Sequence, residues 1–177
     1  MAVVPVRIFG DPVLRARATE VSDFDDGLRR LAGDLEDTMR AANGAGLAAT
    51  QIGVLRRVFT WQASAERHGV CVNPVVVETS EELQESDEGC LSFPGLYYPT
   101  KRALRVRLQM QDLDGDTVEL QGEEVAARIY LHEVDHLNGI LFIDHLARHD
   151  RKEAMRRIRA GELEHPPPPD RDEPPAG

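Results

Sequence analysis

Apolar residues recur every three or four positions between residues 25 and 42, which predicts a helix with one buried face. Asp25 and Asp26 stand at its expected N-terminal end, where carboxylates interact favourably with the helix dipole. Asn43-Gly44 follows as an expected stop signal. The residues expected on the buried face are Leu28, Leu31, Ala32, Leu35, Met39 and Ala42.

Strands are predicted where apolar residues alternate with polar ones or form short runs rich in valine. Residues 55–61 and 70–77 are runs of the second kind and are expected to be buried. Residues 104–111 alternate strictly, which is typical of a strand with one wet side. The turn signal Asp114-Gly115 then predicts a hairpin with residues 117–121 as the returning strand.

Two further helices are predicted in the C-terminal half of the chain. One runs from about Glu123 to Leu137 and ends at Asn138-Gly139, and the other covers residues 148–160. The strands therefore lie between helices without a strand–helix–strand alternation. This order predicts an α+β fold with antiparallel sheet rather than a doubly wound parallel one.

The length of 177 residues suits one domain, which we expect to span residues 1–160. Residues 161–177, "GELEHPPPPDRDEPPAG", hold six of the eleven prolines and almost no apolar residue. Such a segment cannot bury enough apolar surface to offset the entropy lost on ordering. We therefore expect a disordered, proline-rich acidic tail.

Composition excludes several classes of function. The net charge of −10 argues against a protein that coats nucleic acid non-specifically. No apolar run approaches the roughly 18 residues that a membrane span needs, and the first residues do not resemble a signal peptide. Cys71 lies in an apolar run and is expected to be a small buried hydrophobe, and Cys90 is expected to be a free thiol in a cytoplasmic enzyme.

The stretch "LHEVDHLNG", residues 131–139, contains half of a metal site. His132 and His136 are four residues apart, so a helix presents both side chains on one face, where they can share an ion. Glu133 lies on the adjacent strip, close enough to bind a water held by that ion. The alternative is a pair of ordinary surface or core histidines that happen to have this spacing.

The third ligand does not follow from the usual continuations of this motif. Metallopeptidases of the H-E-x-x-H-x-x-G-x-x-H type need a histidine where this chain has Phe142. Thermolysin-like enzymes instead take their third ligand from a glutamate on a later helix, but the later glutamates of this chain lie mostly in the tail. Asp144 and His145 remain candidates just after the helix. The other candidate for the third ligand is Cys90, which follows a glycine and precedes a turn. It would complete a three-ligand site with an open fourth position.

Three motifs occur in a fixed order: "GAGLAATQ" at residues 44–51, "EGCLS" at residues 88–92 and "HEVDH" at residues 132–136. With them the chain resembles the peptide deformylases, whose motifs are G-x-G-L-A-A-x-Q, E-G-C-L-S and H-E-x-D-H. The resemblance covers residues 3–147. It implies antiparallel sheets packed around a central metal-binding helix, with further helices near both ends.

The resemblance also implies a role for individual residues. The metal ligands would be Cys90, His132 and His136. Glu133 would be the general acid and base, while the Gln51 side-chain amide and the Leu91 backbone N–H would polarise the substrate carbonyl. Gly46 and Leu47 would line the substrate cleft and pair with the substrate as an added strand. Ile129 and Val125 lie three and seven residues before His132 on the same helical face, so they are candidate walls of the methionine pocket. Ordinary core packing is the alternative for both, and for Val125 it is an equally good explanation.

Two features depart from the usual family pattern. Leu131 stands where many members have glutamine, and the loop after "EGCLS" carries Tyr97 and Tyr98 where many bacterial members have arginine. These changes leave the expected chemistry intact. They affect the expected contacts with substrate residues beyond the first.

The implied reaction is hydrolysis of the formyl amide on N-terminal formyl-methionine of nascent polypeptides, with release of formate. The implied cofactor is one divalent metal ion, Fe²⁺ in the cell, for which Zn²⁺, Ni²⁺ or Co²⁺ can substitute. Six basic residues within 148–159 suggest a transient ribosome contact, without recognition of a specific nucleic acid sequence or of a membrane. The competing hypotheses are a metallopeptidase and an inert protein that only binds formylated N-termini.

Overall fold

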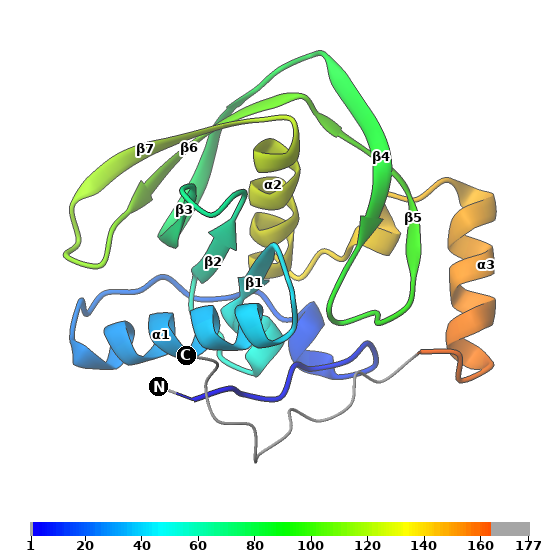
Figure 1. Ribbon diagram of the computed structural model, residues 1–177, viewed down its shortest axis with the longest axis horizontal. Helices are drawn as coiled ribbons and strands as arrows, with labels where there is room; N and C mark the ends of the chain where they lie inside the picture. Colours follow the sequence, from blue (N-terminus) through cyan, green and yellow to red (C-terminus); the bar gives the residue numbers. More distant parts are fainter. Residues whose placement is uncertain (1, 164–177) are drawn as a thin grey trace.

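The fold is built from seven strands and three α-helices in the part that the computed structural model describes, residues 2–163 (Figure 1). The helices are α1 (Asp26–Ala41), α2 (Val125–Leu137) and α3 (Arg148–Arg159), and short 3₁₀ turns are η1 (Pro12–Arg15), η2 (Ala49–Ile52) and η3 (Phe142–Asp144). The strands are β1 (Gly46–Ala48), β2 (Val58–Gln62), β3 (His68–Thr79), β4 (Leu83–Gly89), β5 (Tyr97–Ala103), β6 (Arg105–Gln111) and β7 (Thr117–Glu123). The predicted α+β class is confirmed.

Two antiparallel sheets form, as the alternating segments suggested. The larger sheet has the order β1-β2-β3-β6-β7, and the smaller one pairs β4 with β5. The β6–β7 hairpin forms as predicted from Asp114-Gly115, with Arg105 opposite Glu123 at its far end. Strands β4 and β5 were not predicted, because "LQESDEG" and "YYPTKRA" are mostly polar and show no apolar period.

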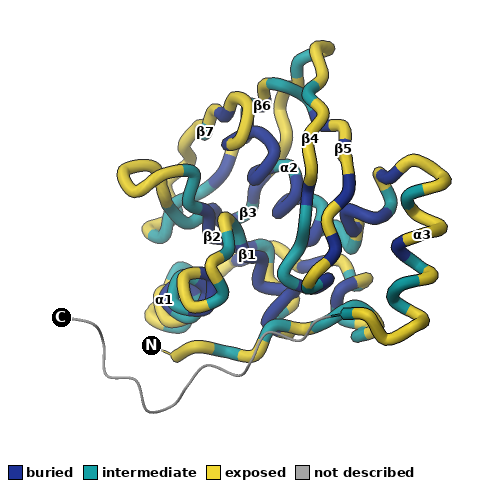
Figure 2. The backbone as a smooth tube through the Cα atoms, turned by 45° about the vertical axis from the view of Figure 1, so that its right-hand side comes forward, coloured by how far each residue is buried: buried dark blue, intermediate teal, exposed yellow. Residues whose placement is uncertain are grey.

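Helix α2 stands between the two sheets, with the large sheet curving around one flank and β4–β5 lying along the other (Figure 1). Most of its residues are buried (Figure 2). Tyr130 is fully buried there and meets Trp61 of β2 edge to face, with ring centroids 4.9 Å apart. The centrally placed helix that the resemblance implied is therefore present, and it carries "HEVDH".

Helix α1 follows its sequence prediction closely. Asp25 caps the N-terminus by accepting a hydrogen bond from the Leu28 N–H at 2.9 Å. Four predicted face residues are buried, Leu28, Ala32, Leu35 and Met39. They pack against β1 and β2, so this helix supports the strand that carries "GAGLAATQ".

Helix α3 lies at the edge of the molecule and ends one residue earlier than predicted. Ala154 is buried, and Met155 and Ile158 pack against the aromatic cluster that contains Phe93 and Phe142. Of the predicted tail, residues 164–177 lie outside the described residues, while Leu163 packs against the same cluster. Within residues 2–163 no helix is both long and apolar enough to span a lipid bilayer.

Candidate active site

His132 and His136 meet on one face of α2, as the four-residue spacing requires. Their Nε2 atoms are 3.1 Å apart, and both side chains are buried. A pair of unrelated surface histidines would not converge in this way. The geometry favours the metal-site interpretation over the chance spacing considered from the sequence.

Cys90 completes the cluster from the residue directly after β4. Its Sγ lies 3.2 Å from His136 Nε2, and the three candidate ligand atoms are all within 4.8 Å of one another. In a tetrahedral thiolate–imidazole site, bond lengths of about 2.0–2.3 Å place two nitrogens about 3.3 Å apart and nitrogen and sulfur about 3.6 Å apart. The three side chains therefore fit one divalent ion, whereas His145 and Asp144 lie outside the cluster.

Glu88 fixes the orientation of His132. Its Oε1 lies 2.7 Å from His132 Nδ1, which leaves Nε2 facing Cys90 and His136. A carboxylate behind a ligand histidine is the usual outer partner in metal sites. Burial raises the pKa of the Glu88 carboxyl, but hydrogen bonds from His132 and Arg102 outweigh it and hold that pKa far below its usual range.

The two histidines differ electrostatically. Burial lowers the pKa of His132, but its contacts with Cys90 and Glu88 outweigh this and raise the pKa well above the usual value. Burial and the neighbouring His132 lower the pKa of His136. In the described part of the chain, His136 Nδ1 is buried without a hydrogen-bond partner.

Glu133 is buried beside the three ligands, with only 3% of its surface exposed. Its Oε2 has no hydrogen-bond partner among the described residues. Burial raises the pKa of Glu133 to about 7, although the charge of His132 opposes the rise. A carboxyl group with such a pKa exchanges protons readily near neutral pH.

Gly46 lets β1 approach this acid. A methyl group on its Cα would lie 2.3 Å from Glu133 Oε1, which is far inside van der Waals contact. The glycine of "GAGLAATQ" is therefore required by the close packing of β1 on α2. Among the described strands β1 pairs with β2 alone, so it is an edge strand, and it contacts the helix that carries both histidines.

Gln51 presents its amide nitrogen to Cys90. The Ala48 N–H donates to Gln51 Oε1 at 2.9 Å, which identifies the other terminal atom as the nitrogen. That Nε2 donates to Ser92 Oγ at 3.2 Å and lies 3.6 Å from Cys90 Sγ. A hydrogen-bond donor is thus held in place next to the candidate metal ligands.

Comparisons with known proteins agree with this arrangement. A family model described as polypeptide deformylase matches residues 3–152. A peptide deformylase of Acidothermus cellulolyticus is 52% identical over 162 residues, which are 92% of this chain and 89% of that protein. The chain belongs to the peptide deformylase family. A peptide deformylase of Parafrankia is 46% identical over 169 residues, 96% of this chain and 92% of the relative.

Solved structures of the peptide deformylase family share the fold. The crystal structure of peptide deformylase from Thermus thermophilus matches with a TM-score of 0.85 and 45% identity, covering 89% of this chain and 94% of that one. Antiparallel sheets around the helix that bears "HEVDH" are therefore the family architecture in this chain as well.

The two expected pocket residues of this peptide deformylase family member have different surroundings. Ile129 is buried and belongs to the core cluster between α2 and the large sheet. Val125 is 60% exposed at the start of α2, so ordinary core packing does not explain it. Tyr97, opposite Gly89 in the β4–β5 pair, is 68% exposed and close to Cys90 in sequence.

Sequence reasoning missed a buried ionic cluster behind His132. Arg102 of β5 contacts both Glu88 and Asp135, and Arg128 of α2 contacts Glu88 as well. Glu88 is part of the motif "EGCLS", but no role could be predicted for this residue from the sequence. The available signal was a row of acids and arginines in segments that otherwise resembled loops.

Proposed function

We propose that this chain hydrolyses the formyl amide on N-terminal formyl-methionine of nascent polypeptides and releases formate. The observation that carries the proposal is the convergence of one thiol and two imidazoles at the helix that also carries Glu133, a buried acid whose Oε2 has no hydrogen-bond partner among the described residues. An inert binder of formylated N-termini would have no use for Glu133. The family membership of the chain points to the same reaction.

Cys90, His132 and His136 would hold one divalent metal ion. When bound, the ion supplies a Lewis acid that polarises the formyl carbonyl and makes an adjacent water more acidic. We propose Fe²⁺ in the cell, as the resemblance to the family implies. Zn²⁺, Ni²⁺ or Co²⁺ could substitute, because thiolate and imidazole ligands suit all four ions. A thiolate ligand and a substrate made at the ribosome both suit a reaction in the cytoplasm.

Glu133 moves the proton in this mechanism. Its carboxylate accepts a proton from the water as the water oxygen attacks the formyl carbon. It then donates that proton to the departing amine nitrogen when the carbon–nitrogen bond breaks, which leaves formate and a free N-terminus. The unpaired Oε2 supports this role, because no other described group competes for the proton.

Gln51 and Leu91 would stabilise the negative charge that develops on the carbonyl oxygen. The Gln51 amide is already oriented by the Ala48 N–H, so it needs no reorganisation when charge appears. Leu91 directly follows Cys90 in the chain, and its backbone N–H would be the second donor. Removing one such donor typically costs about 2.7–4 kcal/mol of barrier.

The substrate would bind as an added strand along the free side of β1. Gly46 and Leu47 offer backbone groups there, and Leu47 anchors the strand by burying its side chain against α1. The methionine side chain would contact Ile129 and the exposed Val125 on α2. Sequence-independent backbone pairing suits an enzyme that processes many different nascent chains.

The decisive test compares formyl-Met-Ala-Ser with its unformylated counterpart, using metal-loaded enzyme. We expect formate release from the first peptide and no chain cleavage of either, whereas cleavage of the Met–Ala bond would favour a metallopeptidase. Glu133→Gln, which keeps the shape, should lower kcat by roughly 10²–10⁴-fold. Unchanged turnover in this variant would refute the assigned role of Glu133.

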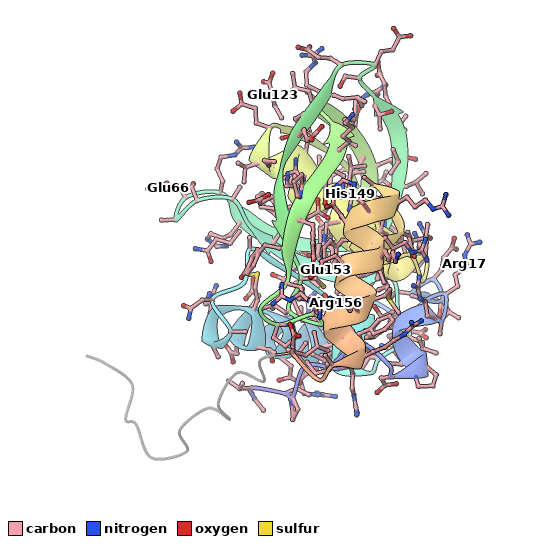
Figure 3. The ribbon with its side chains drawn as sticks, turned by 90° about the vertical axis from the view of Figure 1, so that its right-hand side faces the viewer. Arg17, Glu66, Glu123, His149, Glu153 and Arg156 are labelled. Atoms are coloured by element: carbon pink, nitrogen blue, oxygen red, sulfur yellow. The ribbon has the colours of Figure 1, made fainter. Side chains whose placement is uncertain are left out.

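We also propose that the exposed side of α3 makes the transient ribosome contact. The helix lies at the surface and faces the viewer in Figure 3, where His149, Glu153 and Arg156 mark its length. Several of its basic side chains pair with acids, for example Arg156 with Glu153 at 2.7 Å. The exposed cations with no ion pair among the described residues are Arg148, Lys152 and Arg159.

Deleting α3 would be a poor test, because Ala154 and Ile158 cover the aromatic cluster. Replacing Arg148, Lys152 and Arg159 together with glutamine is better. We expect weaker co-sedimentation with ribosomes and unchanged turnover of a short formylated peptide. A control with Arg30, Arg40 and Arg56 replaced changes charge equally on other surfaces. Equal co-sedimentation of both variants would refute the contact.

A further inference from the structure

Arg128 joins α2 to the small sheet one turn before His132. Its Nη1 donates to Glu88 Oε2 at 2.8 Å and to the Thr100 carbonyl of β5 at 3.0 Å. Since residues 128 and 132 are four apart, both lie on the same side of α2. They contact different oxygens of one carboxylate, because His132 Nδ1 takes Glu88 Oε1 at 2.7 Å.

A second link lies on the other side of His132. Asp135, three residues after it, accepts a hydrogen bond from Arg102 Nη1 at 2.5 Å. Arg102 belongs to β5 and also donates hydrogen bonds to Glu88, from Nε at 3.1 Å and from Nη2 at 2.6 Å. The small sheet is therefore attached to α2 both before and after the ligand histidine, and Arg128 is the link on the N-terminal side.

The position of this sheet matters because β4 leads directly to Cys90. One residue, Gly89, separates Glu88, the partner of His132, from the thiol that meets His136. A shift of β4 along α2 would change both contacts together. A metal site tolerates little such movement, since ligand bonds are fixed within a few tenths of an ångström.

The hydrogen bonding of Arg128 itself argues against a purely stabilising role. Its Nη2 is buried and has no hydrogen-bond partner among the described residues. A buried donor without an acceptor costs about 1–3 kcal/mol, so a guanidinium selected only for stability would be poorly placed here. Arg102, by contrast, uses all three of its nitrogen atoms.

We propose that Arg128 is a positioning residue of the deformylase site, which holds β4 against α2 and so sets where Cys90 meets the two histidines. The inference rests on the proposed metal site and extends it to a residue outside the proposed set of metal ligands. Arg128 acts through Glu88 on His132 and through β4 on Cys90. One cation at the position of Nη1 is sufficient for both contacts.

The test replaces Arg128 with methionine, which keeps the length and removes the cation, and with lysine, which keeps one cation. Zinc affinity is measured by competition with a chelator, and the cobalt-substituted enzyme is examined by visible absorption. We expect Arg128→Met to bind zinc about 10–100-fold more weakly, as is typical when an outer partner is lost. We also expect an altered cobalt spectrum and a lower kcat with unchanged KM.

Arg128→Lys should stay within about threefold of the parent in zinc affinity, because an ammonium can donate to both Glu88 and Thr100. Arg107→Met is the matched control, since Arg107 also joins two acids, Glu78 and Glu119, but on the exposed face of the large sheet. It should leave zinc affinity unchanged. Arg128→Gln supplies a second neutral variant if the methionine variant does not fold.

Three results would overturn the proposal. The first is unchanged zinc affinity in the neutral variants, even with lower thermal stability, and the second is an equal loss in the lysine variant. The third is the same loss in Arg107→Met. Zinc binding is measured without substrate. A parent enzyme that binds zinc but releases no formate when it is loaded with Fe²⁺ would therefore refute the proposed function and leave this inference standing.

Discussion

The two flanks of α2 are held by different forces. The flank toward the large sheet is apolar, with Tyr130 and Leu137 buried among Phe59, Trp61 and Leu108. The flank toward β4–β5 is ionic, with Arg128, Glu88, Arg102 and Asp135 in one connected cluster. Both flanks are buried, so the difference is one of chemistry and not of exposure.

The difference separates stability from positioning. Apolar burial is non-directional, and it stabilises α2 in proportion to the area removed from water. Charge-assisted hydrogen bonds are directional, so they fix individual atoms, but burying the charges costs free energy that good geometry must offset. The ligand-bearing flank uses the second kind of contact, which suits a site where atoms must lie within tenths of an ångström.

The largest effect is expected from breaking the ionic flank at its centre. Glu88→Ala removes the common acceptor of Arg102, Arg128 and His132, so two buried guanidiniums lose the carboxylate that they share. We expect a loss of about 3–5 kcal/mol in the free energy of unfolding, together with weaker zinc binding. Urea unfolding of the metal-free protein and chelator competition measure the two effects. Glu78→Ala, at an exposed pair with Arg107, is the control.

A loss of stability below about 1 kcal/mol would place Glu88 with ordinary exposed pairs and remove the distinction between the flanks.

The apolar flank should lose stability without losing chemistry. Tyr130→Ala leaves a cavity beside Trp61 and should cost about 3–5 kcal/mol in unfolding free energy. The folded, metal-loaded fraction should keep its kcat and its zinc affinity. Tyr130→Phe is the matched control, because the hydroxyl is buried without a hydrogen-bond partner among the described residues, and it should be nearly neutral. A large loss of zinc affinity in Tyr130→Ala would show that both flanks position the ligands.

A smaller effect should follow from pushing α2 away from β7. A methyl group at Gly122 would lie 2.7 Å from the Tyr130 ring and 2.9 Å from the Ala127 backbone nitrogen. Gly122→Ala should therefore destabilise the protein by about 1–3 kcal/mol, as overpacking does. Thermal unfolding measures it, with Gly69→Ala as the control, because a methyl group there would lie 3.4 Å from its nearest neighbour, Trp61 Nε1, which is an ordinary contact. Equal stability of Gly122→Ala and the parent would mean that the helix can shift freely on this flank.

The sequence revealed the apolar flank much better than the ionic one. The periodic positions of α1, the alternation in β6 and the length of α2 all follow from burial patterns, which a single sequence displays. Strands β4 and β5 pair through polar residues, and their partners lie on α2, some forty residues away. Such contacts depend on three-dimensional proximity, so the periodicity of apolar residues along the chain does not predict them.

The candidate site could be predicted because its main residues lie in local sequence motifs. The spacing of His132 and His136 is a local helical signal, and Cys90 and Gln51 came from the resemblance to a family. The structure brings these residues together. The arginines behind Glu88 belong to no motif, and only their burial and their contacts with Glu88 identify them as part of the site.

The smallest effect is expected from an ion cluster that is only partly buried, which tests whether burial gives the ionic flank its strength. Asp144 bonds Arg15, lies 3.3 Å from Arg151 and accepts from the Leu141 N–H at 3.0 Å. Burial raises the pKa of Asp144, but the bond from Arg15 outweighs this and lowers it below the ordinary value. The stabilisation is therefore complete above the ordinary pKa and disappears as the pH falls through the lowered one.

Asp144→Asn should cost at most about 1 kcal/mol at neutral pH, because solvent screens the cluster. The difference in the free energy of unfolding between the variant and the parent should shrink as the pH falls below about 4, where the aspartate becomes protonated. Urea unfolding at several pH values measures it, with Asp23→Asn, an exposed aspartate, as the control. A cost comparable to that of Glu88→Ala would mean that burial does not distinguish the two clusters, and that the position of Glu88 behind a ligand is its only special property.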